Sequence, residues 1–435
     1  MQTTPDPLRI QPTSADEVAA ALRRASDARQ SIVIRGAGTK SEWGRPAAPI
    51  DAVLDMRRMN RLLAHEHGDM TATIEAGATL REVNEALAVH GQTLPLDPPF
   101  ADRTTIGGML ATNDSGPLRH RYGTPRDLVI GIQLATTDGV LSKAGGQVVK
   151  NVAGYDLSKL VTGSFGSLAA IVSATFKLAP VPAASKTMMM AVRDVAALAD
   201  IIRTVMASQL EPVAFELASR RSTQSPQTNP ISTGSASSAL SVVIRFASLP
   251  AVVDAQIEQA MAGLKDFTTS IEVLDGDAER ARWHEHATQL WDGPGAIVRA
   301  SWLPANIASG LEELERIAES ATAMEREPGT PMEREPFRRA AAARLKASPS
   351  IDVLGRAAVG AGLLRIDGDT AAQPSVITPL RASRVFGNVV IVRGSDALKA
   401  LVDVWGSHGD RQPLFDSLKR AFDPNGILNA GRGPL

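Results

Sequence analysis

The stretch from residue 98 to residue 180 constrains the fold more than any other part of the chain. It places glycines at high density between short apolar runs, and it contains both tyrosines of the sequence, Tyr122 and Tyr155. Because glycine loses more backbone entropy on folding than other residues, this density indicates positive φ angles or a close approach of the backbone to a ligand. The small polar residues between the glycines predict a backbone-lined cradle for a large polar ligand.

The composition narrows the chemistry that such a cradle can serve. With 435 residues the chain is too long for one core and predicts two or three domains. Its formal net charge of −1 gives no argument for nucleic acid or an anionic membrane. The absence of cysteine excludes disulfides, a thiolate nucleophile and a cysteine-ligated zinc or iron–sulfur centre in this sequence. Redox chemistry here would need an organic cofactor, or a metal held by a partner chain.

No targeting or membrane-spanning segment is expected. Residues 1–18 contain no basic region followed by an apolar run, and no stretch reaches the roughly 18 apolar residues of a membrane span. We therefore expect a cytoplasmic protein, attached to the inner face of a membrane only through partners.

The order of the expected elements predicts an α+β fold. Residues 1–182 form a first domain, with subdomains of about 1–97 and 98–182. Within it we expect capping boxes starting at Ser14 and Thr79, a short helix at 107–112, a loop at 117–125, a hairpin around Asp138 and Gly139, a helix at 156–161 and a buried strand at 167–178.

The remainder of the chain predicts a second domain and a tail. Helices alternate with strands over residues 183–405, where antiparallel pairing is expected. The Ser- and Thr-rich residues 219–238 and the charged insertion 321–350 are expected to be surface loops. Residues 406–435 form a C-terminal segment that packs back on the first domain.

Residues 35–41 follow a predicted strand, so two nucleotide-binding motifs have to be tested against them. A dinucleotide-binding turn requires glycine where this sequence has Ser41, and a phosphate loop requires Gly-Lys-Ser/Thr where it has Gly38-Thr39-Lys40-Ser41. Both patterns fail. What remains is a run of small residues whose N–H groups could converge on a pyrophosphate, or could form a tight turn and nothing more.

A second segment, residues 104–113, has Gly107 and Gly108 at the expected start of a helix. Two glycines there let phosphate oxygens approach free N–H groups and the positive end of the helix dipole, and Thr105, Thr112 and Asn113 add donors. Close packing of the helix against a sheet would explain the same glycines equally well.

Taken in order, these segments resemble the FAD-binding domain of the vanillyl-alcohol oxidase / p-cresol methylhydroxylase (PCMH) type. The resemblance also includes residues 150–157 and 163–168. In the tail, residues 423–429 resemble the C-terminal motif of the α-hydroxy-acid branch, and the family most similar overall is that of the FAD-binding subunits of bacterial glycolate oxidase (glycolate dehydrogenase). The resemblance is strong over residues 8–182 and extends to the tail. The part of the chain between them matches only in its general pattern of helices and strands.

This resemblance implies an FAD-binding domain of two subdomains, a cap domain, and FAD as the cofactor. It implies that residues 35–41 and 105–113 wrap the pyrophosphate, that residues 163–171 lie beside the adenosine and ribityl parts, and that the tail closes near the isoalloxazine. The residues implied to bind the cofactor are Arg35, Gly36, Ala37, Gly38, Thr39, Lys40, Ser41, Pro98, Thr105, Gly107, Gly108, Thr112, Asn113, Gly116, Tyr122, Gly163, Ser164, Gly166, Ile171 and Asn429.

The resemblance also bears on how the flavin is attached. Some relatives bind FAD covalently through a histidine in the first loop or a cysteine elsewhere. This chain has Thr39 and Lys40 in that loop and no cysteine, so noncovalent FAD is expected.

Histidines give no clear metal or catalytic site. Single-chain relatives that oxidise D-2-hydroxy acids often have a histidine-rich metal site, whereas the seven histidines of this chain include two short pairs, His65/His67 and His284/His286. On a helix, an i,i+2 spacing puts two rings on different faces. We expect no metal, exposed side chains for His65 and His67, and at most a weak catalytic candidate in His284 or His286.

Arginine suits a substrate carboxylate because its planar fork pairs two oxygens. Arg245, Arg299, Arg365 and Arg432 are the weak candidates, although an ordinary solvated or salt-bridged surface arginine is the favoured explanation of each. Arg126 and Lys150, inside the glycine-rich stretch, could instead place positive charge near a reduced flavin.

Three functions remain open. By resemblance, FAD in this chain would take electrons from glycolate or another small 2-hydroxy acid and pass them to an iron–sulfur subunit, in a complex with a second, larger flavin subunit. Alternatively, the chain is a flavin-binding structural subunit that does not itself oxidise glycolate, which the missing histidine cluster favours. The third possibility is an independent oxidase that uses oxygen.

Overall fold

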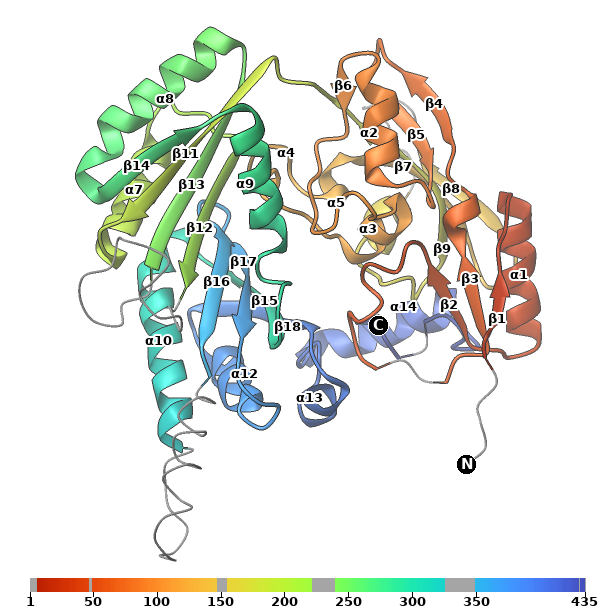
Figure 1. Ribbon diagram of the computed structural model, residues 1–435. Helices are drawn as coiled ribbons and strands as arrows, with labels where there is room; N and C mark the ends of the chain where they lie inside the picture. The colour runs from red at the N-terminus through yellow and green to blue at the C-terminus, as the bar shows by residue number, and fades with distance from the viewer. Residues whose placement is uncertain are drawn as a thin grey trace, which may run out of the picture. The chain divides into compact units, whose positions relative to one another are not determined.

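The computed structural model describes residues 6–46, 49–146, 155–220, 239–324, 349–429 and 431–434. The chain separates into two compact units, one formed by Met1–Val181 with Ser407–Leu435 and the other by Pro182–Gly406 (Figure 1). Helices and antiparallel sheets occur in both units, and the C-terminal segment returns to the first. The predicted α+β fold class is therefore confirmed.

Two main sheets build the first unit. The parallel sheet has the order β1 (Leu8–Ile10), β3 (Ala52–Asp55), β2 (Ile32–Arg35). The antiparallel sheet has the order β4 (Leu62–Glu66), β5 (Thr71–Glu75), β9 (Ala170–Lys177), β7 (Val129–Ala135), β8 (Leu141–Gly145), and a short pair joins β6 (Gln92–Thr93) to β10 (Ala179–Pro180). Since β5 pairs with β9, the sheets do not divide this unit at residue 97.

The helix starts of the first unit follow the capping signals in part. Thr79 and Glu82 form the complete capping box of α2 (Leu80–Ala88). Ser14 caps α1 (Ala15–Asp27), but the Glu17 carboxylate accepts from the N–H of Thr13 rather than from that of Ser14, so the second capping box is only half formed.

Short helices and the tail complete the first unit. The expected helices are present as α3 (Ile106–Thr112) and α6 (Leu157–Val161), and the hairpin of β7 and β8 is confirmed. The loop expected at 117–125 is wrong, because it contains α4 (Arg119–Tyr122) and runs into α5 (Pro125–Leu128). After α14 (Gln412–Phe422), the tail forms a parallel bridge between Leu428 and Ile32 of β2.

An eight-stranded antiparallel sheet organises the second unit. Its order is β14 (Thr268–Leu274), β11 (Ala184–Val192), β13 (Ala239–Ser248), β12 (Ala214–Arg220), β16 (Ile351–Arg356), β17 (Ala361–Ile366), β15 (Ala296–Trp302), β18 (Phe386–Arg393). Of the expected loop 219–238, Ser219 and Arg220 belong to β12, and the rest lies outside the described residues. Most of the expected insertion, 325–348, also lies outside them, and residues 321–324 end α10.

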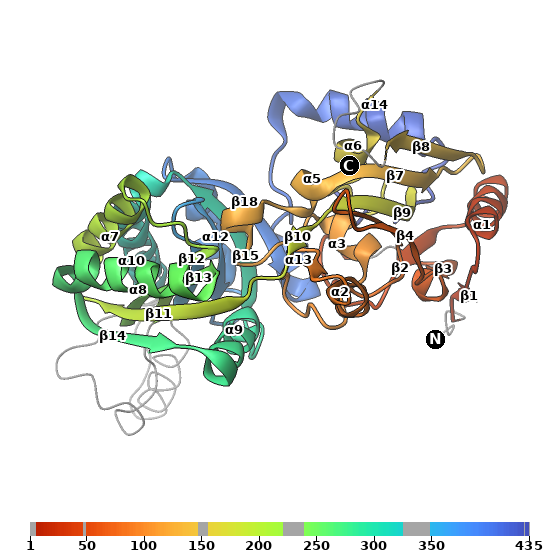
Figure 2. The same cartoon turned by 90° about the horizontal axis from the view of Figure 1, so that it is seen from above.

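The two faces of this sheet differ in chemistry. The apolar core lies between one face and the helices α7 (Val195–Ala207), α8 (Pro250–Leu264), α10 (Ile307–Met324) and α12 (Gln373–Ala382), whereas α9 (Gly276–Thr288) covers part of the opposite face (Figures 1 and 2). The short α13 (Asp396–Leu401) follows β18, and 3-10 turns occur at Met56–Arg58, Lys265–Phe267, Pro304–Asn306 and Gly409–Arg411. None of the helices in the described ranges has both the length and the apolar character needed to cross a membrane.

A buried carboxylate stabilises the parallel sheet of the first unit. Asp55, fully buried at the end of β3, accepts hydrogen bonds from Arg9, Arg57 and Gln11. Burial by itself raises the pKa of Asp55, but these hydrogen bonds outweigh it and hold the pKa well below its usual range.

This lowered pKa makes the stability of the first unit depend on pH. Because the folded pKa lies below the unfolded one, the stabilisation is present above about pH 4 and is lost as the pH falls through the folded pKa. Denaturant unfolding at several pH values measures the free energy of unfolding. In the wild type this free energy should fall by about 1–3 kcal/mol on the acid side, and in Asp55→Asn this fall should be absent. The exposed Asp27→Asn should behave like the wild type, and an unchanged acid limb in Asp55→Asn would contradict the assignment.

Candidate functional site

A cavity opens in the first unit, between segments that are far apart in the sequence. Its empty space is about 870 Å³, with open solvent at its mouth included. The loop 35–41, helix α3, the turn before β9 and the tail form its walls. The described residues that line it are Val33, Ile34, Arg35, Gly36, Ala37, Gly38, Thr39, Lys40, Ser41, Met56, Ala76, Thr105, Gly107, Gly108, Ala111, Thr112, Phe165, Gly166, Ala169, Ile171, Asn429 and Arg432.

Most of the residues implied to bind a cofactor therefore meet around one cavity. These are Arg35, Gly36, Ala37, Gly38, Thr39, Lys40, Ser41, Thr105, Gly107, Gly108, Thr112, Gly166, Ile171 and Asn429. The tail candidate Arg432 joins them.

Six implied residues do not line the cavity. Pro98 is buried, and Gly116 lies against Asp97, whose carbonyl oxygen would be 1.8 Å from an added Cβ. Asn113 ends α3 with φ +47° and accepts from the N–H of Arg126. The remaining three are Tyr122 at the end of α4, Gly163, whose N–H bonds to the carbonyl of Leu110, and the buried Ser164.

The loop 35–41 has the features of an anion-binding turn. It follows β2 and closes with a hydrogen bond from the N–H of Ser41 to the carbonyl of Gly38, where φ is +78°. The N–H groups of Ala37, Gly38 and Thr39 donate no hydrogen bond to any residue that the structure describes. They remain available to an anion such as a pyrophosphate.

The start of α3 differs from the expectation. The N–H of Gly107 donates to the carbonyl of Ala76, and that of Gly108 donates to the side chain of the cap residue Thr105. The idea of free N–H groups at this helix start is therefore wrong, because the carbonyl of Ala76, the residue after β5, and the hydroxyl of Thr105 already accept from them. For Gly107 the packing explanation applies, since an added Cβ would lie 2.8 Å from the Cβ of Ala76.

Three positively charged side chains line the cavity, and they differ in exposure and in their bonding partners. The Arg35 side chain is exposed and makes no ion pair within the described part of the chain. Lys40 is buried and lies 3.3 Å from the carboxylate of Asp114. Arg432 donates to the carbonyl oxygens of Ser41 and Trp43, so it fastens the tail to the loop.

The tail connects two walls of the cavity. The side-chain oxygen of Asn429 accepts from the N–H of Ile34 at 3.0 Å, and its amide donates to the carbonyl of Phe165. The buried carboxylate of Asp423 organises the turn before it, accepting from the N–H groups of Ile427 and Leu428. The motif at 423–429 therefore shapes the wall as well as lining it.

The other catalytic candidates lie in the second unit. Arg245 on β13 pairs with Glu279 of α9 at 3.0 Å. On the same helix, His284 is exposed and His286 is fully buried, with its Nε2 3.1 Å from the carboxylate of Glu216. Burial lowers the pKa of His286 although Glu216 opposes this, which fits a structural imidazole. Arg299 lies on β15, between β17 and β18.

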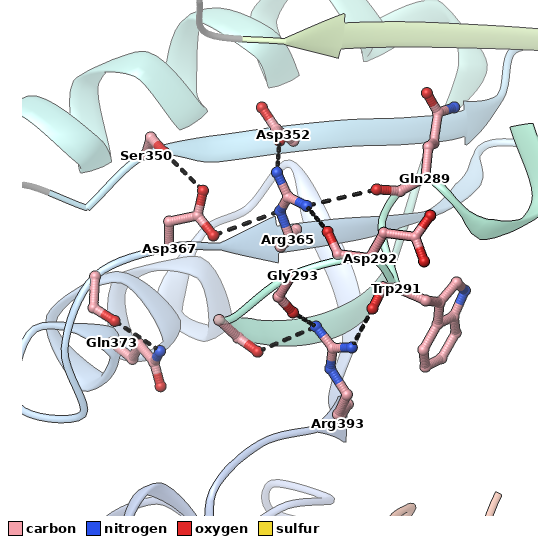
Figure 3. Close-up of polar contacts among 12 residues, drawn as sticks. Gln289, Trp291, Asp292, Gly293, Ser350, Asp352, Arg365, Asp367, Gln373 and Arg393 are labelled. Atoms are coloured by element: carbon pink, nitrogen blue, oxygen red, sulfur yellow. Dashed lines mark hydrogen bonds and ion pairs between the residues drawn. The ribbon is translucent and has the colours of Figure 1, made fainter. Parts of the chain in front are cut away.

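Arg365 is also held within its own unit (Figure 3). Its guanidinium bonds to the carboxylate of Asp352 at 2.6 Å and to the carbonyl of Asp292 at 3.1 Å, and it lies 3.4 Å from Asp367. Arg393 bonds to the carbonyl oxygens of the same segment, including that of Trp291 at 2.7 Å. These arginines fasten the segment between α9 and β15.

The remaining charged candidates add no catalytic site. Arg126 is exposed at the start of α5, and Lys150 lies outside the described residues. The expected exposure of His65 is wrong, because β4 half-buries it against Gln92, with its Nε2 2.8 Å from the Gln92 oxygen, whereas His67 is exposed. In the ranges that the structure describes, no group of three His, Cys, Asp or Glu residues could hold a metal ion.

Sequence reasoning missed the apolar part of the wall. Val33, Ile34, Met56, Ala76, Ala111, Phe165 and Ala169 line the cavity without a motif of their own. A helical period places Ala111 on the same face as Gly107 and Gly108, so that residue was within reach of the sequence.

Comparisons with known proteins agree with this geometry. A family described as FAD binding domain matches residues 7–145. The chain is 33% identical to glycolate oxidase subunit GlcD of Bacillus subtilis (strain 168), over 49% of this chain and 46% of that protein. It is 34% identical to glycolate oxidase subunit GlcE of Escherichia coli (strain K12), over 42% of this chain and 51% of that protein. The resemblance to glycolate oxidase subunits is thus confirmed.

Further matches define how far the similarity extends. The chain is 34% identical to D-lactate dehydrogenase of Archaeoglobus fulgidus, over 39% of this chain and 38% of that protein. It spans about half, or less, of the length of these curated relatives. A solved structure of alkyldihydroxyacetonephosphate synthase has a TM-score of 0.70 and 19% identity, over 97% of this chain and 75% of that one, which shows likeness of fold alone.

Proposed function

We propose, from the match of residues 7–145 to an FAD-binding domain, that this chain is the FAD-binding subunit of an enzyme that oxidises glycolate or another small 2-hydroxy acid. The relatives named as glycolate oxidase subunits and D-lactate dehydrogenase support this class of substrate. The observation that carries the proposal is the cavity that loop 35–41, α3 and the tail enclose.

The residues around the cavity fit an FAD molecule. The N–H groups of the loop 35–41 and the exposed Arg35 suit the pyrophosphate, because backbone donors and a guanidinium both recognise phosphate oxygens. Phe165, Ala169 and Ile171 give an apolar surface for rings. FAD bound there would supply the redox chemistry, and the chain would bind it, orient it and limit its contact with water.

We expect the flavin to be held without a covalent bond. The described residues that line the cavity include no histidine, and cysteine is absent from the sequence. Acid precipitation of the holoprotein should leave the yellow flavin in the supernatant. A yellow protein pellet after washing in denaturant would contradict noncovalent binding.

The proposal extends to partners. We infer that electrons leaving the flavin pass to a partner that carries an iron–sulfur cluster, since a chain without cysteine supplies no thiolate to hold such a cluster itself. The two subunit names among the relatives fit a complex with a larger flavin subunit and an iron–sulfur subunit.

One observation favours a second candidate, a subunit that binds FAD for assembly without oxidising the substrate itself. Arg245 and Arg365, two candidates for a substrate carboxylate, are paired with carboxylates of their own unit. Arg432 is bonded to two backbone carbonyls. A substrate would have to displace these contacts, at the cost of leaving a buried carboxylate such as Asp352 uncompensated.

Anaerobic titration of the purified FAD-loaded chain with glycolate separates these functions. Loss of the visible flavin absorbance supports oxidation by this chain, and D-lactate in parallel tests the substrate class. A flavin that stays oxidised contradicts oxidation of the substrate by this chain and supports the assembly role. Hydrogen peroxide release in air would instead support an independent oxidase.

A further inference from the structure

We propose that Lys40 is a positioning residue, whose buried ammonium holds the loop 35–41 at a defined distance from α3, rather than a ligand of the cofactor phosphate. The inference rests on the FAD cavity proposed above. It assigns Asp114, which no cofactor motif includes, to the same task.

The ammonium of Lys40 is enclosed by protein groups. The side chains of Lys40 and Asp114 are 8% and 5% exposed, and Nζ lies 3.3 Å from the Asp114 carboxylate. Nζ also donates to the hydroxyl of Thr104 at 3.2 Å and lies 5.6 Å from the ring centre of Trp43. A buried ammonium requires such compensation, since an unpaired charge there would be strongly unfavourable.

These partners flank α3 on both sides. Thr104 directly precedes Thr105, the cap residue of α3, and its hydroxyl donates to the carbonyl of Pro99. Asp114 follows α3, and its N–H donates to the carbonyl of Met109 in the last turn. One ammonium on the loop is thus fastened to the segments that enter and leave the helix.

The contacts of Lys40 set the distance between two walls of the cavity, the loop 35–41 and α3. They lie close together at Gly36, where an added Cβ would be 2.1 Å from the hydroxyl oxygen of Thr105. Thr39 is also near Thr104, with 3.5 Å between the hydroxyl oxygens. An uncompensated Lys40 or Asp114 would change the separation of the walls, and with it the positions of the loop N–H groups.

The variant Asp114→Asn separates positioning from direct binding. If the pair positions the loop, Asp114→Asn should weaken FAD binding about tenfold, as loss of a supporting contact behind a ligand-binding group does. If Lys40 binds the phosphate directly, freeing its ammonium should leave FAD affinity unchanged or increase it, and that result would overturn the inference.

FAD titration of the apoprotein, followed by flavin fluorescence, measures these affinities alongside the thermal midpoint of each apoprotein. Lys40→Met should also weaken binding, and Lys40→Met with Asp114→Asn should be no weaker than either single variant, because the two residues act as one unit. Should Asp114→Asn not fold, Lys40→Arg decides: a positioning role predicts loss of affinity, whereas retained affinity would overturn it. Failure of the wild type to bind FAD would instead refute the proposed cavity and the inference with it.

Discussion

Replacing Gly36 with alanine is expected to weaken FAD binding about 100-fold. The new Cβ would lie 2.1 Å from the Thr105 hydroxyl oxygen and 3.0 Å from the Thr105 Cβ, so the loop and the start of α3 must separate. Overpacking of this kind costs up to about 3 kcal/mol, and 1.4 kcal/mol corresponds to a factor of ten in affinity. Titration of the apoprotein with FAD measures the effect.

Gly68→Ala is the matched control, because no atom lies within 4 Å of the Cβ it would add. It should bind FAD like the wild type. Equal affinities for Gly36→Ala and Gly68→Ala would mean that the walls at Gly36 and Thr105 do not bind the cofactor.

Asp423→Ala is expected to destabilise the first unit by about 3–5 kcal/mol. The Asp423 carboxylate is 2% exposed, accepts two backbone N–H groups and lies 2.6 Å from the ammonium of Lys419. Removing it leaves two buried N–H groups without their acceptor and the Lys419 ammonium without its counter-charge, although the carbonyl oxygens of Ser167 and Leu428 still accept from that ammonium. Urea unfolding followed by circular dichroism measures the loss.

The same change should weaken FAD binding, because the turn that Asp423 holds leads to Asn429 and Arg432 in the cavity wall. Asp416→Ala, at an exposed position of α14, is the control and should change stability by less than about 0.5 kcal/mol. A loss in Asp423→Ala no larger than in this control would contradict the structural role given to the tail motif.

Local signals in the sequence predicted much of the first unit. The Thr79–Glu82 spacing predicted the start of α2, and Asp138 with Gly139 predicted the hairpin of β7 and β8. The small residues 35–41 identified a loop that lines the cavity. Each of these signals acts between residues close in sequence, where capping and turn chemistry are specific.

The remainder depends on contacts between distant residues. The pairing of β5 with β9 joins Thr71 to Lys177, and the partner of Lys40 is Asp114. Nothing local to Gly107 shows that its N–H is taken by Ala76. The carboxylate partners of Arg245 and Arg365 come from α9 and from another strand, so the sequence did not show that these weak candidates for a substrate carboxylate are already paired.

We propose that the cavity of the first unit binds FAD noncovalently. The most direct test is an equilibrium titration of the 435-residue apoprotein with FAD, followed by acid precipitation of the loaded protein. We expect saturable binding of a single FAD per chain, which Gly36→Ala weakens and Gly68→Ala does not, and full release of the flavin on precipitation. Binding that does not saturate, or that is the same in both variants, would contradict it.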